Sequence, residues 1–163
     1  MQTKLTFSKK LLLIFALVLL IPSVSLGNGI SVSASEIDNP SGSRCRVVLT
    51  DYRPNSGVMY VGNCGWTGLK GIGAYVQAWN HSNHIKVVRG HFESGTVQSF
   101  AKVTYINRLE GIVQTYEESM FITKNLRQYD LADLISDANQ SGLHFNNTVF
   151  AYIKFANYVD IRE

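Results

Sequence analysis

The amino-acid sequence predicts an all-β domain, a mainly antiparallel β-sandwich or small barrel of about seven or eight strands, with one short helix near residues 130–139. Three observations lead to this prediction. Apolar and polar residues alternate with a period of two along most of the chain after residue 43, which is the pattern of half-buried strands. Turn residues recur at intervals of roughly 8–15 residues. A helical period occurs in a single segment of this region.

The expected strands follow one another from residue 44 onward. In the first strand, Cys45, Val47 and Leu49 share one face. A glycine-rich connection is expected at Gly62–Gly73 and a turn at His81–His84. A phosphate-binding loop is excluded at the first of these because a strand, and not a helix, is expected to follow it. The strands are expected at residues 44–50, 58–61, 74–80, 85–92, 96–107, 112–123 and 149–161.

The one expected helix has its apolar residues at helical spacing, at Leu131, Leu134, Ile135 and Ala138. Asp130 is a suitable N-cap, and a glycine at position 142 can end the helix. An isolated helix of about ten residues is only marginally stable in water. We therefore expect its apolar side to cover one end of the sheet.

The N-terminal residues 1–27 have the layout of a secretory signal peptide. Three lysines precede Leu11–Ile21, an unbroken run of 11 apolar residues that is too short to span a bilayer as a helix. Cleavage is expected after Gly27, with Ala34 as the alternative, and an uncleaved anchor as a second alternative. The prediction is thus a secreted protein with a flexible lead-in at 28–43, a single domain at 44–163 and no transmembrane anchor after processing.

Removing the leader changes the charge of the chain. It subtracts three lysines and no acidic residue, so the 15 basic residues become 12, equal to the 12 acidic ones. A chain without net positive charge lacks the general basic surface that nucleic acids attract. It also lacks a polybasic patch for anionic membranes. A nucleic-acid partner is therefore not expected.

The chain has two cysteines, Cys45 and Cys64, 19 positions apart. An even number of cysteines in an exported protein predicts a disulfide. Neither cysteine lies in a CxxC or CxxH spacing, which weakens the alternative of a zinc ligand or reactive thiol.

Aromatic residues mark two candidate binding surfaces. Trp66 lies among glycines in the connection, either as a plug over the core or as a contact residue. Tyr75, Gln77 and Trp79 share one face of a strand and form either a binding platform or a second half of the core. Tryptophan and tyrosine are enriched at binding surfaces. The expected partner is an extracellular or cell-surface glycan or protein.

Histidines provide the weaker candidates for chemistry. His81, His84 and His91 have a spacing from which imidazoles could converge on zinc or copper. The same histidines, with Glu93 or Asp51, could form a general acid–base pair in a hydrolase. No GxSxG, HExxH or SxxK motif is present, and no cofactor is expected.

The favoured function is a small secreted binding or interaction module at a cell surface or in the extracellular matrix. An enzyme is less favoured because no nucleophile is marked. The alternatives are a small secreted hydrolase with a histidine–carboxylate site and a secreted membrane-active toxin or antimicrobial protein.

Overall fold

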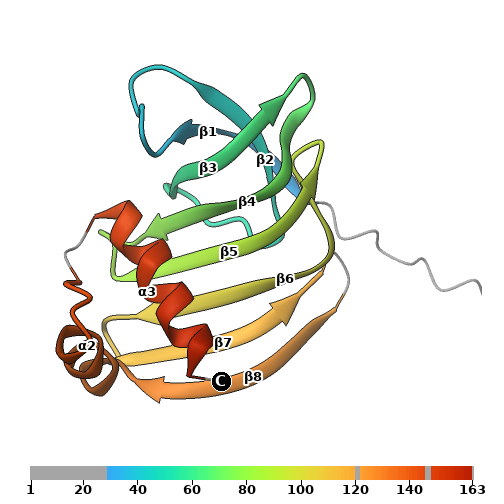
Figure 1. Ribbon diagram of the computed structural model, residues 1–163. Helices are drawn as coiled ribbons and strands as arrows, with labels where there is room; N and C mark the ends of the chain where they lie inside the picture. The colour runs from blue at the N-terminus through green and yellow to red at the C-terminus, as the bar shows by residue number, and fades with distance from the viewer. Residues whose placement is uncertain (1–28, 120–121, 146–147, 163) are drawn as a thin grey trace, which may run out of the picture.

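A computed structural model describes residues 29–119, 122–145 and 148–162. The predicted signal peptide and its cleavage site after Gly27 lie outside the described residues. The described chain forms a β-sheet followed by two helices (Figure 1). The elements are β1 Ile30–Glu36, β2 Arg44–Leu49, β3 Gly57–Gly65, β4 Gly68–Trp79, β5 His84–Glu93, β6 Thr96–Asn107, β7 Ile112–Glu118, β8 Thr123–Asp130, α2 Leu131–Gln140 and α3 Val149–Ile161.

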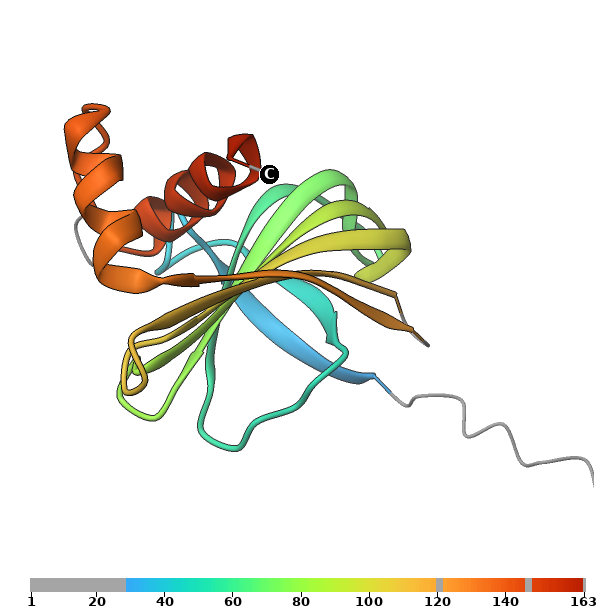
Figure 2. The same cartoon turned by 90° about the horizontal axis from the view of Figure 1, so that it is seen from below.

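All eight described strands belong to one sheet in the order β2-β1-β3-β4-β5-β6-β7-β8. Every neighbouring pair is antiparallel except β1 and β3, which are parallel. The sheet is strongly curved, so β2 at one edge also contacts β4 and β6. Figure 2 shows this curvature, with the helices on one side of the sheet and the loop after β2 on the other.

The prediction of an all-β fold with about seven or eight strands and one short helix is confirmed, and the described residues contain a second helix, α3. The two layers expected of a sandwich arise from the curvature of a single sheet, because β2 folds back over the face of the strands that follow it. The interior therefore has two parts, one inside the curve and one under the helices. We call the face inside the curve the concave face and the other the helix face.

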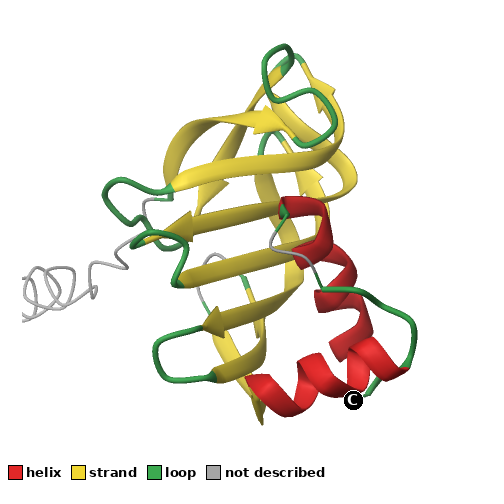
Figure 3. Cartoon of the chain, turned by 90° about the vertical axis from the view of Figure 1, so that its left-hand side faces the viewer, coloured by secondary structure: helices red, strands yellow, loops and turns green. Residues whose placement is uncertain are grey.

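Successive side chains of a strand point to opposite faces of the sheet, so each strand contributes residues to both parts of the core. On β4, Ala74 and Val76 are buried on the helix face, while Tyr75 is buried on the concave face. The helix α3 lies across the helix face (Figure 3). Its Phe155 is fully buried in the same cluster as Val76 and Val87.

The strand predicted at residues 149–161 is wrong, because this segment is α3. Thr148 caps the helix, its hydroxyl accepting from the Ala151 amide at 3.3 Å. The segment is apolar on nearly all sides, so its sequence fits a period of two as well as 3.6. Burial follows the helical period, because Lys154 and Asn157 are exposed three positions apart, while the residues around them are buried: Ala151, Tyr152, Ile153, Phe155, Ala156 and Val159.

Three further boundaries differ from the prediction. Residues 28–43 contain β1, which pairs with strands on both sides, so Ile30–Glu36 is not a flexible lead-in. The glycine-rich segment Gly62–Gly73 lies mostly within the paired strands β3 and β4. The strand expected at 112–123 ends earlier, at Glu118, and only its last residue, Thr123, belongs to the next strand, β8. In the first two cases pairing with neighbours overrides weak local strand propensity.

The helix predicted at residues 130–139 is confirmed as α2. The Asp130 carboxylate accepts a hydrogen bond from the Asp133 amide at 3.0 Å, and Gly142 adopts a φ of 81° beyond its C-terminal end. Leu134 and Ala138 are its buried residues. In the part of the chain that the structure describes, neither helix is long and apolar enough to cross a membrane.

The predicted disulfide is also confirmed. Cys45 of β2 is bonded to Cys64 of β3. The bridge joins two strands that are not neighbours in the sheet, because β1 lies between them. Closing a loop of this length stabilises the fold by about 3 kcal/mol in the chain-entropy model.

Candidate functional site

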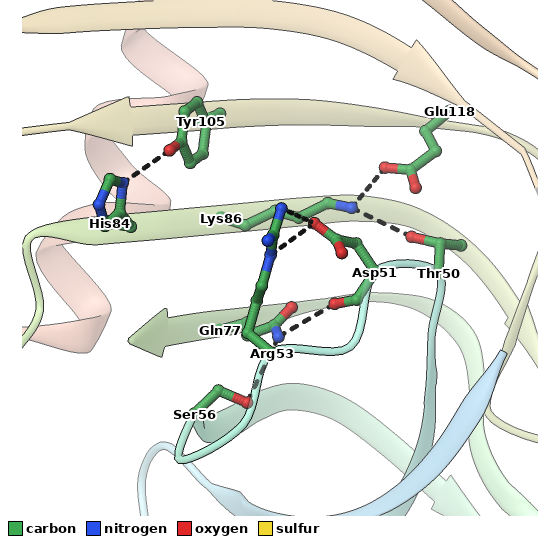
Figure 4. Close-up of polar contacts among 9 residues, drawn as sticks. All are labelled: Thr50, Asp51, Arg53, Ser56, Gln77, His84, Lys86, Tyr105 and Glu118. Carbon is green, nitrogen blue, oxygen red and sulfur yellow. Dashed lines mark hydrogen bonds and ion pairs between the residues drawn. The ribbon is translucent and has the colours of Figure 1, made fainter. Parts of the chain in front are cut away.

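A pocket of about 250 Å³ opens on the concave face, between the loop after β2 and strands β4 to β7. Its walls combine aromatic rings with charged and amide side chains. The lining residues are Asp51, Arg53, Trp79, Lys86, Tyr105, Gln114 and Tyr116. The polar contacts around it are drawn in Figure 4.

Lys86 of β5 is the most deeply buried charged residue that lines the pocket, with 3% of the residue exposed. Its Nζ forms an ion pair with Glu118 of β7 at 2.6 Å and donates to Thr50 Oγ1 at 3.0 Å. Burying two charges is costly unless they are paired and hydrogen-bonded. An ammonium group has three N–H donors, so two contacts leave one donor for a further acceptor.

Gln77 of β4 connects the sheet to the loop that forms the opposite wall. Its Nε2 donates to the carbonyl of Asp51 at 3.1 Å and to Ser56 Oγ at 3.3 Å. The side chain is fully buried, and its Oε1 has no hydrogen-bond partner among the described residues. This amide holds the loop, and with it Asp51 and Arg53, over the concave face (Figure 4).

Three rings at one end of the pocket lie nearly parallel. Trp79 is stacked with His84 at 5.5 Å between centroids and with Tyr105 at 5.9 Å. His84 Nδ1 and the Tyr105 hydroxyl are 2.7 Å apart and share a hydrogen bond. The Arg53 guanidinium lies 5.7 Å from the centroid of the Trp79 ring. These contacts hold the aromatic wall in one arrangement.

The charges in and below the pocket are paired. Arg53 contacts Asp51 at 3.0 Å, and Lys86 contacts Glu118. Burial is the main cause that raises the pKa of Tyr105 and Tyr116. Both hydroxyls therefore stay neutral at physiological pH and can donate as well as accept hydrogen bonds.

The structure places the four predicted binding residues in different environments. Trp79 lines the pocket, and Gln77 lies buried beside it. Tyr75 is fully buried in the core of the concave face. Trp66 is fully exposed in the turn between β3 and β4, at the opposite end of β4 from Trp79. A strand of 12 residues extends on the order of 35–40 Å, so the two tryptophans cannot contact one small ligand together.

The predicted histidine sites are not assembled. His81 is in an exposed turn, His84 pairs with Tyr105, and His91 is exposed seven residues farther along β5. None of the three has a hydrogen bond or ion pair with Glu93 or Asp51, and Asp51 pairs with Arg53 instead. Among the described residues, no group of three histidine, cysteine or acidic side chains is placed to hold a metal ion.

Sequence reasoning missed most of the pocket, including Arg53, Lys86, Tyr105, Gln114 and Tyr116. The sequence contained one signal that could have identified a pocket residue. Lys86 interrupts the apolar run from Ile85 to Val88, where a solvated lysine would not be expected. The other missed residues lie on two different strands and a loop, so no local motif connects them.

Comparison with known proteins gives no relative: no family model, curated protein or solved structure matches this chain.

Proposed function

We propose that the protein is a secreted binding protein that holds a neutral saccharide unit of a cell-surface or extracellular glycan in the pocket on the concave face. The observation that carries this proposal is the combination of aromatic rings with a buried, charge-paired polar floor. Function is assigned to the pocket, with Trp79 as the contact residue, and not to the exposed Trp66.

The aromatic wall favours a ligand with flat apolar patches. The C–H faces of a sugar ring can lie against aromatic rings such as those of Trp79, Tyr105 and Tyr116. Since Trp79 is braced by His84 and Arg53, these contacts require little reordering of side chains when the ligand binds.

The polar floor favours hydroxyl groups without net charge. Lys86 retains one N–H donor after its bonds to Glu118 and Thr50. Gln114 also lines the pocket, and its Nε2 donates to Gln128 Oε1 at 3.0 Å. The two cations that line the pocket already have carboxylate partners, Lys86 with Glu118 and Arg53 with Asp51. An anionic ligand would have to compete with these carboxylates. A neutral ligand with several hydroxyls fits this arrangement better than a phosphate or carboxylate.

Secretion is proposed from the leader, and the position of β1 favours one cleavage site over the other. Cleavage after Ala34 would remove Ile30–Ala34 from β1, including Ala34 itself, which is fully buried. Cleavage after Gly27 leaves the strand whole. We therefore propose that the exported chain begins at Asn28, which mass spectrometry of the exported protein would test.

The binding test is retention of the chain from Asn28, which contains both cores, on insoluble polysaccharides, cell-wall polymer, washed cells and liposomes. We expect retention on at least one glycan-bearing bait. Trp79→Ala should weaken it by about tenfold or more, as truncation of a central tryptophan contact does. Trp66→Ala is the matched control, with an expected change of less than about twofold because its side chain is remote from the pocket.

Treating the bait separates glycan from protein partners. Periodate cleaves vicinal diols, so it should abolish retention, whereas protease treatment should leave it intact. Retention that survives periodate and is lost with protease would overturn the saccharide assignment. Loss of retention in Trp66→Ala, but not in Trp79→Ala, would move the site to the β3–β4 turn.

A further inference from the structure

A second hollow lies on the helix face, separate from the pocket on the concave face. Its volume is about 320 Å³, and it is lined by Gly57, Met59, Val76, Ala78, Ser82, Arg108 and Tyr152. Val76 and Ala78 are on the face of β4 opposite to Tyr75 and Gln77. The sheet therefore separates the two cavities.

The floor of this hollow is apolar. It consists of Gly57 and Met59 of β3 with Val76 and Ala78 of β4, while Tyr152 of α3 forms part of the wall. Gly57 is exposed, and a Cβ built on it would have no atom within 4 Å. The hollow is thus open space above a strand pair that α3 does not fully cover.

Arg108 is the one charged residue among the described residues that line the hollow. Its backbone amide donates to the Asn83 carbonyl at 2.8 Å, beside Ser82 in the β4–β5 turn. Its Nη2 donates to the Tyr152 hydroxyl at 2.7 Å, and its guanidinium carbon lies 5.6 Å from the centroid of that ring. The cation is therefore held in place by both its backbone and its side chain.

We propose that this hollow binds a medium-chain fatty acid, with the alkyl chain on the apolar floor and the carboxylate against Arg108 and Ser82. A planar guanidinium carries five N–H donors in a fork that matches a carboxylate. At about 30 Å³ for each water-sized unit, the volume holds roughly ten non-hydrogen atoms. Octanoate has that size.

The chemistry of the hollow selects this ligand over its close analogues. An alcohol of the same length would fill the floor without pairing with the cation, and an alkylamine would be repelled by it. A peptide helix, with a diameter of about 10–12 Å including side chains, exceeds the size of the hollow. Charge complementarity at one end and apolar contact along the rest both favour an amphipathic carboxylate.

The test is calorimetric titration of the chain from Asn28 with sodium octanoate, 1-octanol and octylamine, with the two ionic probes below their micellar concentrations and octanol below its solubility limit. We expect saturable 1:1 binding of octanoate, weaker binding of octanol and none of octylamine. Arg108→Gln should lower octanoate affinity by about tenfold or more, since a charge-assisted pair is lost, and should change octanol affinity by less than about twofold.

A filling variant tests the location without touching the arginine. Gly57→Leu should abolish binding of octanoate and octanol, because its side chain occupies the open space, and Gly57→Ala should retain both. Circular dichroism checks that each variant is folded. Absence of octanoate binding, equal affinity for octylamine, or octanoate binding undiminished in a folded Gly57→Leu would overturn the proposal. The saccharide site is unaffected by these outcomes, because it lies across the sheet.

Discussion

The two faces of the sheet are built from alternate residues of the same strands, yet they bury charged groups to different depths. The core under α3 centres on apolar residues such as Val76, Val87 and Phe155. Its ion pair, Arg89 of β5 with Asp160 of α3, is partly exposed, with 11% and 19% of the two side chains accessible. On the concave face, the fully or nearly fully buried residues include Gln77, Lys86 and Glu118.

This difference separates stability from the proposed function within one sheet. Apolar burial stabilises in proportion to the area removed from water, and it needs no particular partner. Buried amides and charges lose hydration, and they are tolerated only where other groups satisfy them. More of these costly groups are deeply buried around the pocket on the concave face, which agrees with the proposed binding of a ligand through polar contacts.

The largest expected effect comes from the helix face. Phe155→Ala should lower the free energy of unfolding by about 4–5 kcal/mol, because the fully buried ring leaves a cavity between α3 and the sheet. Urea unfolding followed by circular dichroism measures this loss. Phe150→Ala, on the exposed side of the same helix, is the control, and it should cost less than about 1 kcal/mol. Equal losses in the two variants would show that α3 does not pack as described.

A smaller loss is expected when the ion pair of the concave face is broken. Lys86→Met should destabilise by about 3–4 kcal/mol, because Glu118 then remains buried without its cation. The double variant Lys86→Met/Glu118→Leu should recover most of that loss, since no isolated charge is left. A double-mutant cycle from urea unfolding measures the coupling. If the double variant is as unstable as the single one, packing and not charge governs this position.

The disulfide should contribute least of the three. Replacing both Cys45 and Cys64 with alanine should lower the free energy of unfolding by about 3 kcal/mol, through the greater freedom of the unfolded chain. Comparing the oxidised protein with this variant in urea gives the value. Since the bridge ties β2 to β3, amide hydrogen exchange should quicken in β1 and β2 more than in α3. A uniform change across the chain would argue against this local role.

Several features follow from local sequence alone. The alternation of Cys45, Val47 and Leu49 matches their burial, and Asp130 caps the short helix as expected. The two cysteines pair, as their number and the predicted export implied. Each of these features depends on neighbouring residues or on a count, so a sequence without relatives suffices to predict it.

The proposed binding site could be predicted only in part. The alternation that placed Tyr75, Gln77 and Trp79 on one face is correct, but the pattern could not tell which of them meets solvent. The exposure of each of these side chains depends on its distance from β2 and from the loop after β2, which cover part of the concave face. The loop reaches Gln77 and Lys86 through Asp51, Ser56 and Thr50, which are 21 to 36 positions away in the chain.

The sequence by itself therefore determined the strand-rich class, the capped helix α2 and the disulfide, because propensity, capping and residue count act locally. The tertiary structure decided that residues 149–161 form a helix, since an evenly apolar segment fits either period until it is packed against a surface. It also decided that β1 is a strand and that the sheet curves over its own concave face. Both pockets are products of that curvature and of the position of α3, which no local pattern encodes.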